Sequence, residues 1–263
     1  MQEIENLVSD GVVEVMLLGQ NVNSYRGKCD GEVWEFPRLL EEINKIEGLQ
    51  RIRFMTSHPK DMSDDLIKAF GRLDKLSKYV HLPVQSGSNN VLRKMNRRYK
   101  VDDYLILIEK LRKEVPDITI STDIIVGFPG ETEDDFLDTL RLVESVRYDS
   151  AFTFLYSVRK DTPAEKFKDQ VDEDVKHERF NRLVELVNQI SAEKNAEYVG
   201  NVYKVLVDGY SKTDVNVLSG RTDGFKLVNF RANADSSDLI GKLVDVKITN
   251  AKTFSLEGEM LLG

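Results

Sequence analysis

Short runs of β-branched residues alternate with longer amphipathic segments from the start of the chain to Tyr156. Such alternation is typical of βαβ units, in which parallel strands form a sheet or barrel covered by helices. The expected strands are Val12–Leu18, Arg51–Thr56, Tyr79–Val84, Ile118–Val126 and Ala151–Tyr156, and helix-like stretches lie near 37–47, 63–73, 88–113 and 131–147. We therefore predict an α/β fold with a parallel sheet or a partial barrel.

The chain opens with a short amphipathic helix instead of a strand. Its apolar stripe includes Ile4 and Leu7 and stops at Gly11, a natural C-terminal cap. A chain of βα repeats should begin with a strand. We therefore expect a strand and its loop to be missing upstream of Met1, which would leave Val12–Leu18 or its neighbour with an unpaired flank.

The texture of the sequence changes near Gly200. Residues Asp172–Tyr198 predict one long, heavily charged helix. Five short alternating strands follow, at Tyr203–Val207, Val215–Leu218, Lys226–Phe230, Leu243–Ile248 and Ser255–Leu261. Five strands in about 60 residues predict a small closed β-barrel. We divide the chain into a partial barrel (1–170), a linking helix (171–200) and a β-barrel (201–263).

The chain has a net charge of −8, from 37 basic and 45 acidic residues. The whole deficit lies in residues 1–200, because the segment from Asn201 onward has eight residues of each sign. RNA binding rests on phosphate neutralisation, so any RNA contact must come from local basic patches. No apolar run approaches the ~20 residues that cross a bilayer, and the N-terminus lacks the features of a signal peptide. We expect a cytoplasmic protein without membrane contact.

The chain has one cysteine, Cys29, within the polar stretch Arg26–Gly31 that we interpret as a loop. A lone thiol excludes an intrachain disulfide and cannot hold an iron–sulfur cluster, which needs three or four thiolates. We interpret Cys29 as an incidental cytosolic thiol and predict no metal site in this chain.

Polar residues follow several expected strands at their carboxyl ends, where α/β barrels carry their functional loops. Gln20 and Asn21 follow the first strand, Gln85 and Ser86 follow the third, and a turn that starts at Gly127 follows the fourth. Amides and hydroxyls at such positions offer donors and acceptors to a small polar ligand. An amide-rich turn or a helix cap also explains each of them taken alone.

Two further features carry charge. His58 follows the second strand, where it is either a metal ligand or proton-transfer residue, or a turn residue beside Pro59. Five cations lie within the segment from Arg93 to Lys100, in an otherwise acidic domain. Both a solvated helix face and a site for an anion or RNA phosphate explain this cluster.

Five blocks of the sequence resemble a known enzyme family in their order and spacing. They are LLGQNVNSY (17–25), RFMTSHP (53–59), HLPVQSGSNNVLRKMNRRY (81–99), STDIIVGFPGETEDDF (121–136) and FTFLYSVRKDTPA (152–164). Together they resemble the radical S-adenosylmethionine (SAM) methylthiotransferases, and the form GQNVNSY is similar to their tRNA-modifying (MiaB-type) branch. The C-terminal barrel resembles the TRAM domain, an RNA-binding module.

This resemblance implies an enzyme that places a methylthio group at C2 of an isopentenylated adenosine beside the tRNA anticodon, by means of a 5′-deoxyadenosyl radical. It implies SAM and 4Fe–4S clusters as cofactors and the tRNA anticodon stem-loop as partner, and we expect a monomer. The family's C-x3-C-x2-C motif and its N-terminal cysteines are not in this chain. The chain by itself is therefore predicted to bind no cluster and to be inactive.

The resemblance also implies roles for individual residues. For SAM, Gln20 and Asn21 would contact the methionyl end, Gln85 and Ser86 the ribose, and Arg97 the carboxylate, whereas Asp123, Ile125 and Gly127 would line the adenine. For RNA, the candidates are the cations Arg93, Arg98, Arg221, Lys226 and Arg231. Aromatic residues of the small barrel such as Tyr203 face either RNA or the barrel's own core.

Two alternatives stay open. One is a methylthiotransferase that acts on another modified tRNA or on a ribosomal protein, although the form GQNVNSY favours the isopentenylated tRNA substrate. The other is a cluster-free RNA-binding protein that keeps the barrel as a scaffold, which would account for the missing cysteines. An aldolase-type barrel would need a lysine or a pair of acids at the strand ends, and apart from Asp123 the sequence offers no such group.

Overall fold

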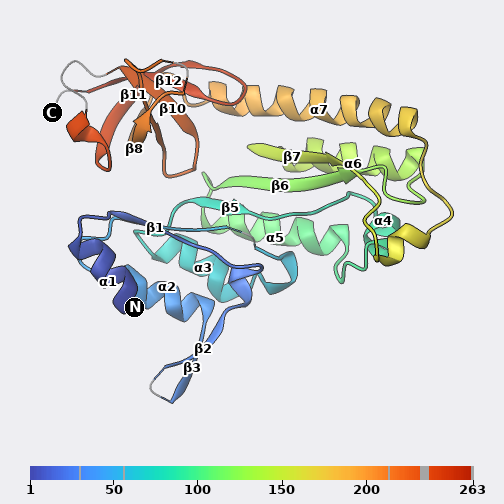
Figure 1. Cartoon of the computed structure of the whole chain (residues 1–263), viewed down its shortest axis with the longest axis horizontal. Coiled ribbons are helices and arrows are strands. Elements are labelled where there is room, and N and C mark those ends of the chain that lie inside the picture. Colours follow the sequence, from blue (N-terminus) through green and yellow to red (C-terminus); the bar gives the residue numbers. More distant parts are fainter. Residues whose placement is uncertain (30, 56, 213, 232–236, 262–263) are drawn as a thin grey trace.

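Five parallel strands form an open half-barrel, and five further strands form a small closed barrel beside one end of it (Figure 1). The structure is a computed structural model that describes residues 1–29, 31–55, 57–212, 214–231 and 237–261. The predicted strand end at Thr56 and the loop residue Asp30 lie outside the described residues. None of the described helices is long and apolar enough to cross a membrane.

The half-barrel is built from parallel pairs. Its strands are β1 (Glu14–Leu17), β4 (Arg51–Phe54), β5 (Tyr79–His81), β6 (Thr119–Val126) and β7 (Ser150–Leu155). β1 pairs with β4, and β5, β6 and β7 form a three-stranded sheet. A parallel bridge between Ile52 and Leu76 joins the two groups at the residues just before β5. The predicted α/β architecture is confirmed, and among the described residues β1 pairs with β4 alone.

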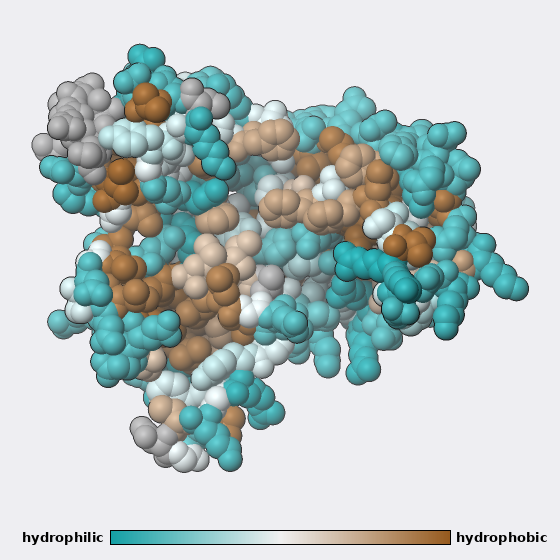
Figure 2. Space-filling view, in the orientation of Figure 1, coloured by the Kyte–Doolittle hydropathy of each residue, from teal (hydrophilic) through white to brown (hydrophobic). Residues whose placement is uncertain are grey.

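Helices cover the convex face of the half-barrel (Figure 1). They are α2 (Phe36–Asn44), α3 (Asp64–Arg72), α4 (Asn89–Lys94), α5 (Val101–Glu114), α6 (Glu133–Val146) and α7 (Glu173–Ala196), with α1 (Gln2–Ser9) before β1. Alternate strand residues such as Ile52, Phe54 and Ile124 are fully or almost fully buried in this core. On the other side, Phe152 and Phe154 of β7 are half-exposed, and Figure 2 shows apolar surface between the closed barrel and the helices below it.

Three local predictions were wrong. The stretch 88–113 is two helices, because the chain turns at Asn96, which has a φ of 57°. The expected loop at Arg26–Gly31 belongs to a hairpin, formed by β2 (Arg26–Cys29) and β3 (Glu32–Glu35), that projects from the half-barrel (Figure 1). The strand expected at Val215–Leu218 is instead Leu218–Arg221, so it begins at the last residue of the predicted range.

The closed barrel has the strand order β10-β12-β11-β8-β9. Its members are β8 (Val202–Tyr210), β9 (Leu218–Arg221), β10 (Leu227–Arg231), β11 (Leu243–Ala251) and β12 (Leu256–Met260). Val205, Val228, Phe230 and Ile248 are almost fully buried inside it. The predicted five-stranded closed barrel is therefore confirmed.

The turn between β9 and β10 closes the amino-terminal end of the half-barrel. Arg53 of β4 donates to the carbonyl of Thr222 at 2.7 Å and to that of Asp223 at 3.0 Å. Phe225 packs on Tyr79 of β5, with ring centroids 4.9 Å apart. Because the turn occupies the amino end, ligand access is left to the carboxyl ends of the strands, where α/β folds carry their sites.

Candidate functional site

A cavity of about 720 Å³ opens at the carboxyl ends of β5, β6 and β7. The residues that line it include Gln85, Arg97, Asp123, Ile125, Phe128 and Tyr156. Four of the eight residues predicted to bind the cofactor therefore share one cavity. Gln85, Asp123 and Ile125 meet because parallel strands bring their carboxyl ends to the same edge of a sheet, and Arg97 reaches the cavity from the turn between α4 and α5.

Gln85 is fixed to β6 through its backbone. Its N–H donates to the carbonyl of Asp123 at 2.8 Å, and its own carbonyl accepts the N–H of Ile125 at 2.9 Å. It has a φ of 71°, a left-handed conformation that costs a non-glycine residue on the order of 1–3 kcal/mol. Such strain concentrates at functional sites, where the surrounding structure enforces it.

Arg97 and Asp123 give the cavity opposite charges. Asp123 Oδ1 lies 3.4 Å from Nε2 of His81, whose Nδ1 lies 2.8 Å from the hydroxyl of Ser121. Among the described residues, the half-buried guanidinium of Arg97 has no hydrogen-bond or ion-pair partner. Sequence reasoning missed His81, which is a β5 residue that faces Asp123 from the neighbouring strand.

Tyr156 was also missed. It lines the cavity, and its buried hydroxyl has no hydrogen-bond partner among the described residues. A buried hydroxyl without a partner costs about 1–3 kcal/mol, so a polar ligand atom at this place would relieve it. The signal in the sequence was its position at the end of the fifth strand.

Ser86 and Gly127 lie behind the cavity wall. Ser86 is fully buried, and its hydroxyl accepts the N–H of Ser88 at 3.1 Å. Gly127 has a φ of 78°, and a Cβ on it would come within 2.3 Å of Cγ of Lys176. The close packing of the turn against α7 thus requires glycine there. The predicted contacts of both residues with SAM stay predictions.

The turn after β6 is held by a buried carboxylate. Glu131 accepts the N–H of Gly127 at 3.0 Å and pairs with Arg179 of α7 at 3.1 Å. Burial raises the pKa of Glu131 to about 7, against the lowering effects of the Gly127 N–H and the Arg179 guanidinium. The turn, α6 and α7 are therefore tied together directly behind the cavity.

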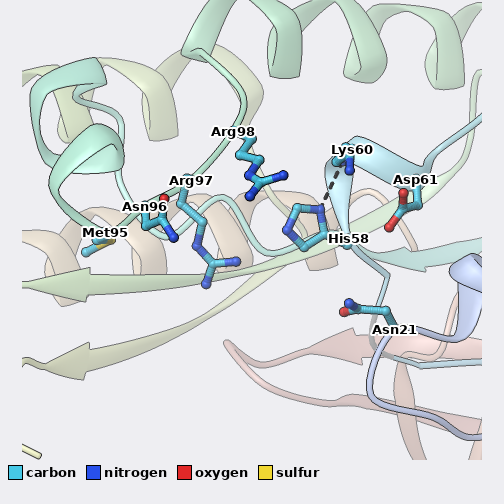
Figure 3. Close-up of a pocket in the computed structure, with 8 residues that line it drawn as sticks. All are labelled: Asn21, His58, Lys60, Asp61, Met95, Asn96, Arg97 and Arg98. Atoms are coloured by element: carbon cyan, nitrogen blue, oxygen red, sulfur yellow. Dashed lines mark hydrogen bonds between the residues drawn. The ribbon is translucent and has the colours of Figure 1, made fainter. Parts of the chain in front are cut away.

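The structure separates Gln20 and Asn21 from this cavity. Asn21 lines a second, smaller cavity of about 290 Å³ together with His58, Arg97 and Arg98 (Figure 3). Gln20 is exposed and lines neither of the two cavities. Arg97 lines both, so the two cavities adjoin at this residue.

The cations predicted to contact RNA differ in exposure. Arg93, Arg98 and Arg231 are exposed, and Arg221 is half-buried, with its guanidinium 4.3 Å from the ring centroid of Phe225. Lys226, the fifth candidate, is buried and pairs with Asp149 at 3.2 Å. Lys226 is buried because the turn before β10, to which it belongs, docks into the half-barrel.

Comparison with protein families decides the assignment. Residues 1–143, more than half of the chain, match the Radical SAM superfamily. The chain belongs to the radical SAM superfamily. Residues 196–261 match the TRAM domain, and they include the whole closed barrel. The division of the chain at residues 170 and 200 stays a prediction.

Curated relatives of this radical SAM chain share a name. The tRNA-2-methylthio-N(6)-dimethylallyladenosine synthase of Clostridium botulinum (strain Okra / Type B1) is 60% identical over 257 residues, which cover 98% of this chain and 56% of that protein. The Clostridium perfringens (strain 13 / Type A) protein of the same name is 56% identical, with coverages of 99% and 58%. The chain thus spans little more than half the length of these relatives. Among solved structures, coproporphyrinogen III oxidase from Escherichia coli is 17% identical, with a TM-score of 0.49 over 71% of this chain and 50% of that one.

Radical SAM chemistry needs SAM and a 4Fe–4S cluster. The residues of this chain suit SAM but not the cluster. The larger cavity fits SAM, because it is lined by the cationic Arg97, the anionic Asp123 and Tyr156, whose buried hydroxyl has no partner among the described residues. A 4Fe–4S cluster does not fit the residues present, because Cys29 is the single thiol of the sequence and lies in the projecting hairpin. The described residues also contain no group of three His, Cys, Asp or Glu side chains placed to hold a metal ion.

Proposed function

We propose that this chain is the SAM- and RNA-binding part of a tRNA methylthiotransferase. Its reaction is methylthiolation at C2 of N6-isopentenyladenosine next to the anticodon. The observation that carries the proposal is the cavity at the carboxyl ends of β5–β7, where Arg97 and Asp123 face a space that a cofactor with both charged and hydroxyl groups would fill. The 60% identity with proteins named for this reaction supports the choice of substrate.

Each wall of the cavity would have its own task. The guanidinium of Arg97 would grip the SAM carboxylate, since arginine binds carboxylates with paired hydrogen bonds. The side chain of Gln85 would donate to the ribose, and Asp123 and Ile125 would border the adenine. SAM supplies a radical only when a reduced 4Fe–4S cluster cleaves it, so we expect this chain to bind SAM and to be inactive by itself.

The RNA partner would extend from the cavities at the carboxyl ends of the strands to the closed barrel at the amino-terminal end. We propose the tRNA anticodon stem-loop, with Arg93 and Arg98 beside the cavities and with Arg221 and Arg231 on the closed barrel. Contacts of arginine side chains with RNA phosphates supply much of the affinity in such complexes and do not depend on base sequence. We further propose that the protein acts as a monomer in the cytoplasm.

Nucleoside analysis of tRNA tests this function. In a strain that lacks the complete gene, mass spectrometry of digested tRNA should show N6-isopentenyladenosine in place of its 2-methylthio derivative. Restoring the complete gene should restore the methylthio group. A different substrate would be assigned if the deletion strain kept the 2-methylthio derivative of N6-isopentenyladenosine. That strain would instead lose methylthiolation on another tRNA nucleoside or on a ribosomal protein.

A second candidate follows from Cys29. Since this single thiol cannot hold a cluster, a cluster-free RNA-binding protein that uses the same scaffold also fits the residues present. The DNA upstream of the codon for Met1 separates the two. An in-frame extension with a C-x3-C-x2-C motif would favour the enzyme, whereas an in-frame stop codon close to Met1, with a ribosome-binding site, would favour the binding protein.

A further inference from the structure

The smaller cavity of about 290 Å³ is rich in positive charge (Figure 3). Lys60, Arg97 and Arg98 contribute three cations and Asp61 one carboxylate, which leaves a net charge of +2. Among the residues that the structure describes, the side chains of these three cations form no hydrogen bond or ion pair. Asp61 is engaged elsewhere, since its Oδ2 accepts the hydroxyl of Ser24 at 2.6 Å.

Lys94, from the same segment, shows the contrast. Its ammonium group pairs with Asp169 at 2.9 Å and donates to the carbonyl of Gly130 at 3.2 Å. Cations that serve the fold are neutralised in this way. The three cations of the smaller cavity come from two separate loops and have no such partner among the described residues, so they are available to an anion.

His58 supplies a fixed hydrogen-bond donor to the cavity. Its Nδ1 accepts the backbone N–H of Lys60 at 3.1 Å, so the neutral ring carries its proton on Nε2. Burial is the main cause that lowers the pKa of His58; the nearby Arg97 and Lys60 lower it further, and Asp61 opposes them. The neutral form of the ring offers Nε2–H, and Figure 3 shows the Arg98 guanidinium pointing toward the His58 ring.

The backbone of His58 is held as firmly as its ring. The side-chain amide of Asn23 bonds both the N–H and the carbonyl of His58, at 2.9 and 3.0 Å. The ring also meets that of Tyr99 edge-on, at 5.9 Å between centroids. A histidine fixed at its backbone, its Nδ1 and its ring face is preorganised for one partner at Nε2.

We propose that this cavity binds a phosphate group, and that an RNA strand is the source of that phosphate. Two guanidiniums, one ammonium group and an imidazole N–H are all donors, which suits an anion with several acceptor oxygens. The cavity of about 290 Å³ lies at the lower end of the roughly 300–1,000 Å³ typical of ligand sites, which suits a small charged group. Only the choice of RNA as the source rests on the proposed function.

The position of Arg97 between the two cavities places the phosphate site next to the cofactor site. Because Arg97 lines both cavities, a phosphate in the smaller one would lie beside the cofactor in the larger one. A backbone phosphate held there would fix the register of the strand, and with it the position of the target base relative to the cofactor. Phosphate contacts set position in this way without reading sequence.

Histidine-ring NMR of this chain tests the proposal. The three histidines are distinguished by a His58→Gln variant, and inorganic phosphate is added at constant pH and ionic strength. The His58 ring signals should shift and saturate. Arg98→Gln and Lys60→Gln should each weaken phosphate binding by at least about five-fold, which corresponds to about 1 kcal/mol. Lys113→Gln, which removes the same charge from an exposed position on α5, should leave the binding unchanged.

Two results would overturn the site. One is that the His58 ring signals do not shift when phosphate is added, and the other is that Arg98→Gln, Lys60→Gln and Lys113→Gln weaken phosphate binding equally. A second arm uses an RNA hairpin as competitor. A hairpin that blocks the phosphate-induced shift supports RNA as the source, whereas phosphate binding that the hairpin does not affect would overturn that source and support free phosphate. Calorimetry with SAM is run in parallel, because absent SAM binding would count against the proposed function and leave the phosphate result standing.

Discussion

The side chain of Asn23 clamps the backbone of His58. Its Nδ2 donates to the His58 carbonyl at 3.0 Å, and its Oδ1 accepts the His58 N–H at 2.9 Å. The two residues belong to the loops after β1 and β4, so this pair joins two strand exits. Asn23 is 7% exposed, and water therefore cannot readily replace either bond.

Replacing Asn23 by Ala tests this clamp. The substitution leaves the N–H and carbonyl of His58 without partners, and we expect the free energy of unfolding to fall by about 1–3 kcal/mol. Urea unfolding monitored by circular dichroism measures the change. Ser24→Ala is the matched control, because it removes one hydrogen bond at an exposed position and should cost less than about 0.5 kcal/mol. Equal losses for the two variants would contradict the role of Asn23.

Arg53 joins the two barrels and offers a second test. Its side chain is 1% exposed, and Nε pairs with Glu14 at 2.9 Å while the other nitrogens bind the turn at Thr222 and Asp223. Burial is the main cause that lowers the pKa of Arg53, and Glu14 opposes it. Arg53→Ala breaks the ion pair with Glu14, which keeps Arg51 as a partner at 3.2 Å, and removes the hydrogen bonds to the two turn carbonyls. We therefore expect a loss of about 1–3 kcal/mol.

Thermal and urea unfolding of the Arg53→Ala variant measure that loss. The closed barrel should also become easier to cleave from the half-barrel by limited proteolysis, because the turn loses its main anchor. Arg38→Ala is the control, since Arg38 is half-exposed and bonds to Glu41 and Glu42 of its own helix. A loss below 1 kcal/mol for Arg53→Ala would show that other contacts hold the two barrels together.

Local pattern was sufficient to predict most of the fold. The β-branched runs identified all five parallel strands, because buried strands need apolar side chains at regular spacing. The same reasoning failed for the hairpin β2–β3, whose residues are mostly polar and exposed. It also failed at Asn96, because one left-handed residue divides a continuous amphipathic pattern into two helices.

The candidate site was predictable to the extent that topology determines it. The carboxyl ends of parallel strands lie together, and this brings Gln85 and Asp123 into one cavity, which Arg97 reaches from the turn between α4 and α5. The burial of Lys226 was not predictable, because it depends on a partner, Asp149, that is 77 residues away in the chain. The bonds between Asn23 and His58 span 35 residues, and no local pattern reports them.

The buried Glu131 predicts a pH dependence of stability. Its pKa is about 7 in the folded protein and 4.5 as an unperturbed group, with burial as the main cause of the rise. The folded state therefore binds this proton more tightly than the unfolded state. The contribution of Glu131 to the free energy of unfolding should fall as the pH rises from about 4.5 to about 7.

Glu131→Gln removes this titration. The free energy of unfolding of the unmodified chain minus that of the variant should decrease by roughly 1–3 kcal/mol between pH 4.5 and pH 7.5. Urea unfolding of both proteins across this range measures it. A constant difference would mean that the ion pair with Arg179 keeps Glu131 ionised throughout and that burial has little effect on its proton.

Arg97 provides the sharpest test of the cofactor cavity. Its guanidinium lacks a protein partner among the described residues and lines the same space as Asp123, so a ligand carboxylate would be its counter-ion. Hydrogen bonds to charged groups contribute about 1.5–3 kcal/mol, and Arg97→Ala should weaken SAM binding by about 10- to 100-fold in calorimetry. Lys113→Ala, on the exposed face of α5, should leave the affinity as it is. If both variants bind SAM equally well, Arg97 is not the carboxylate partner, and its place between the two cavities would then serve the phosphate alone.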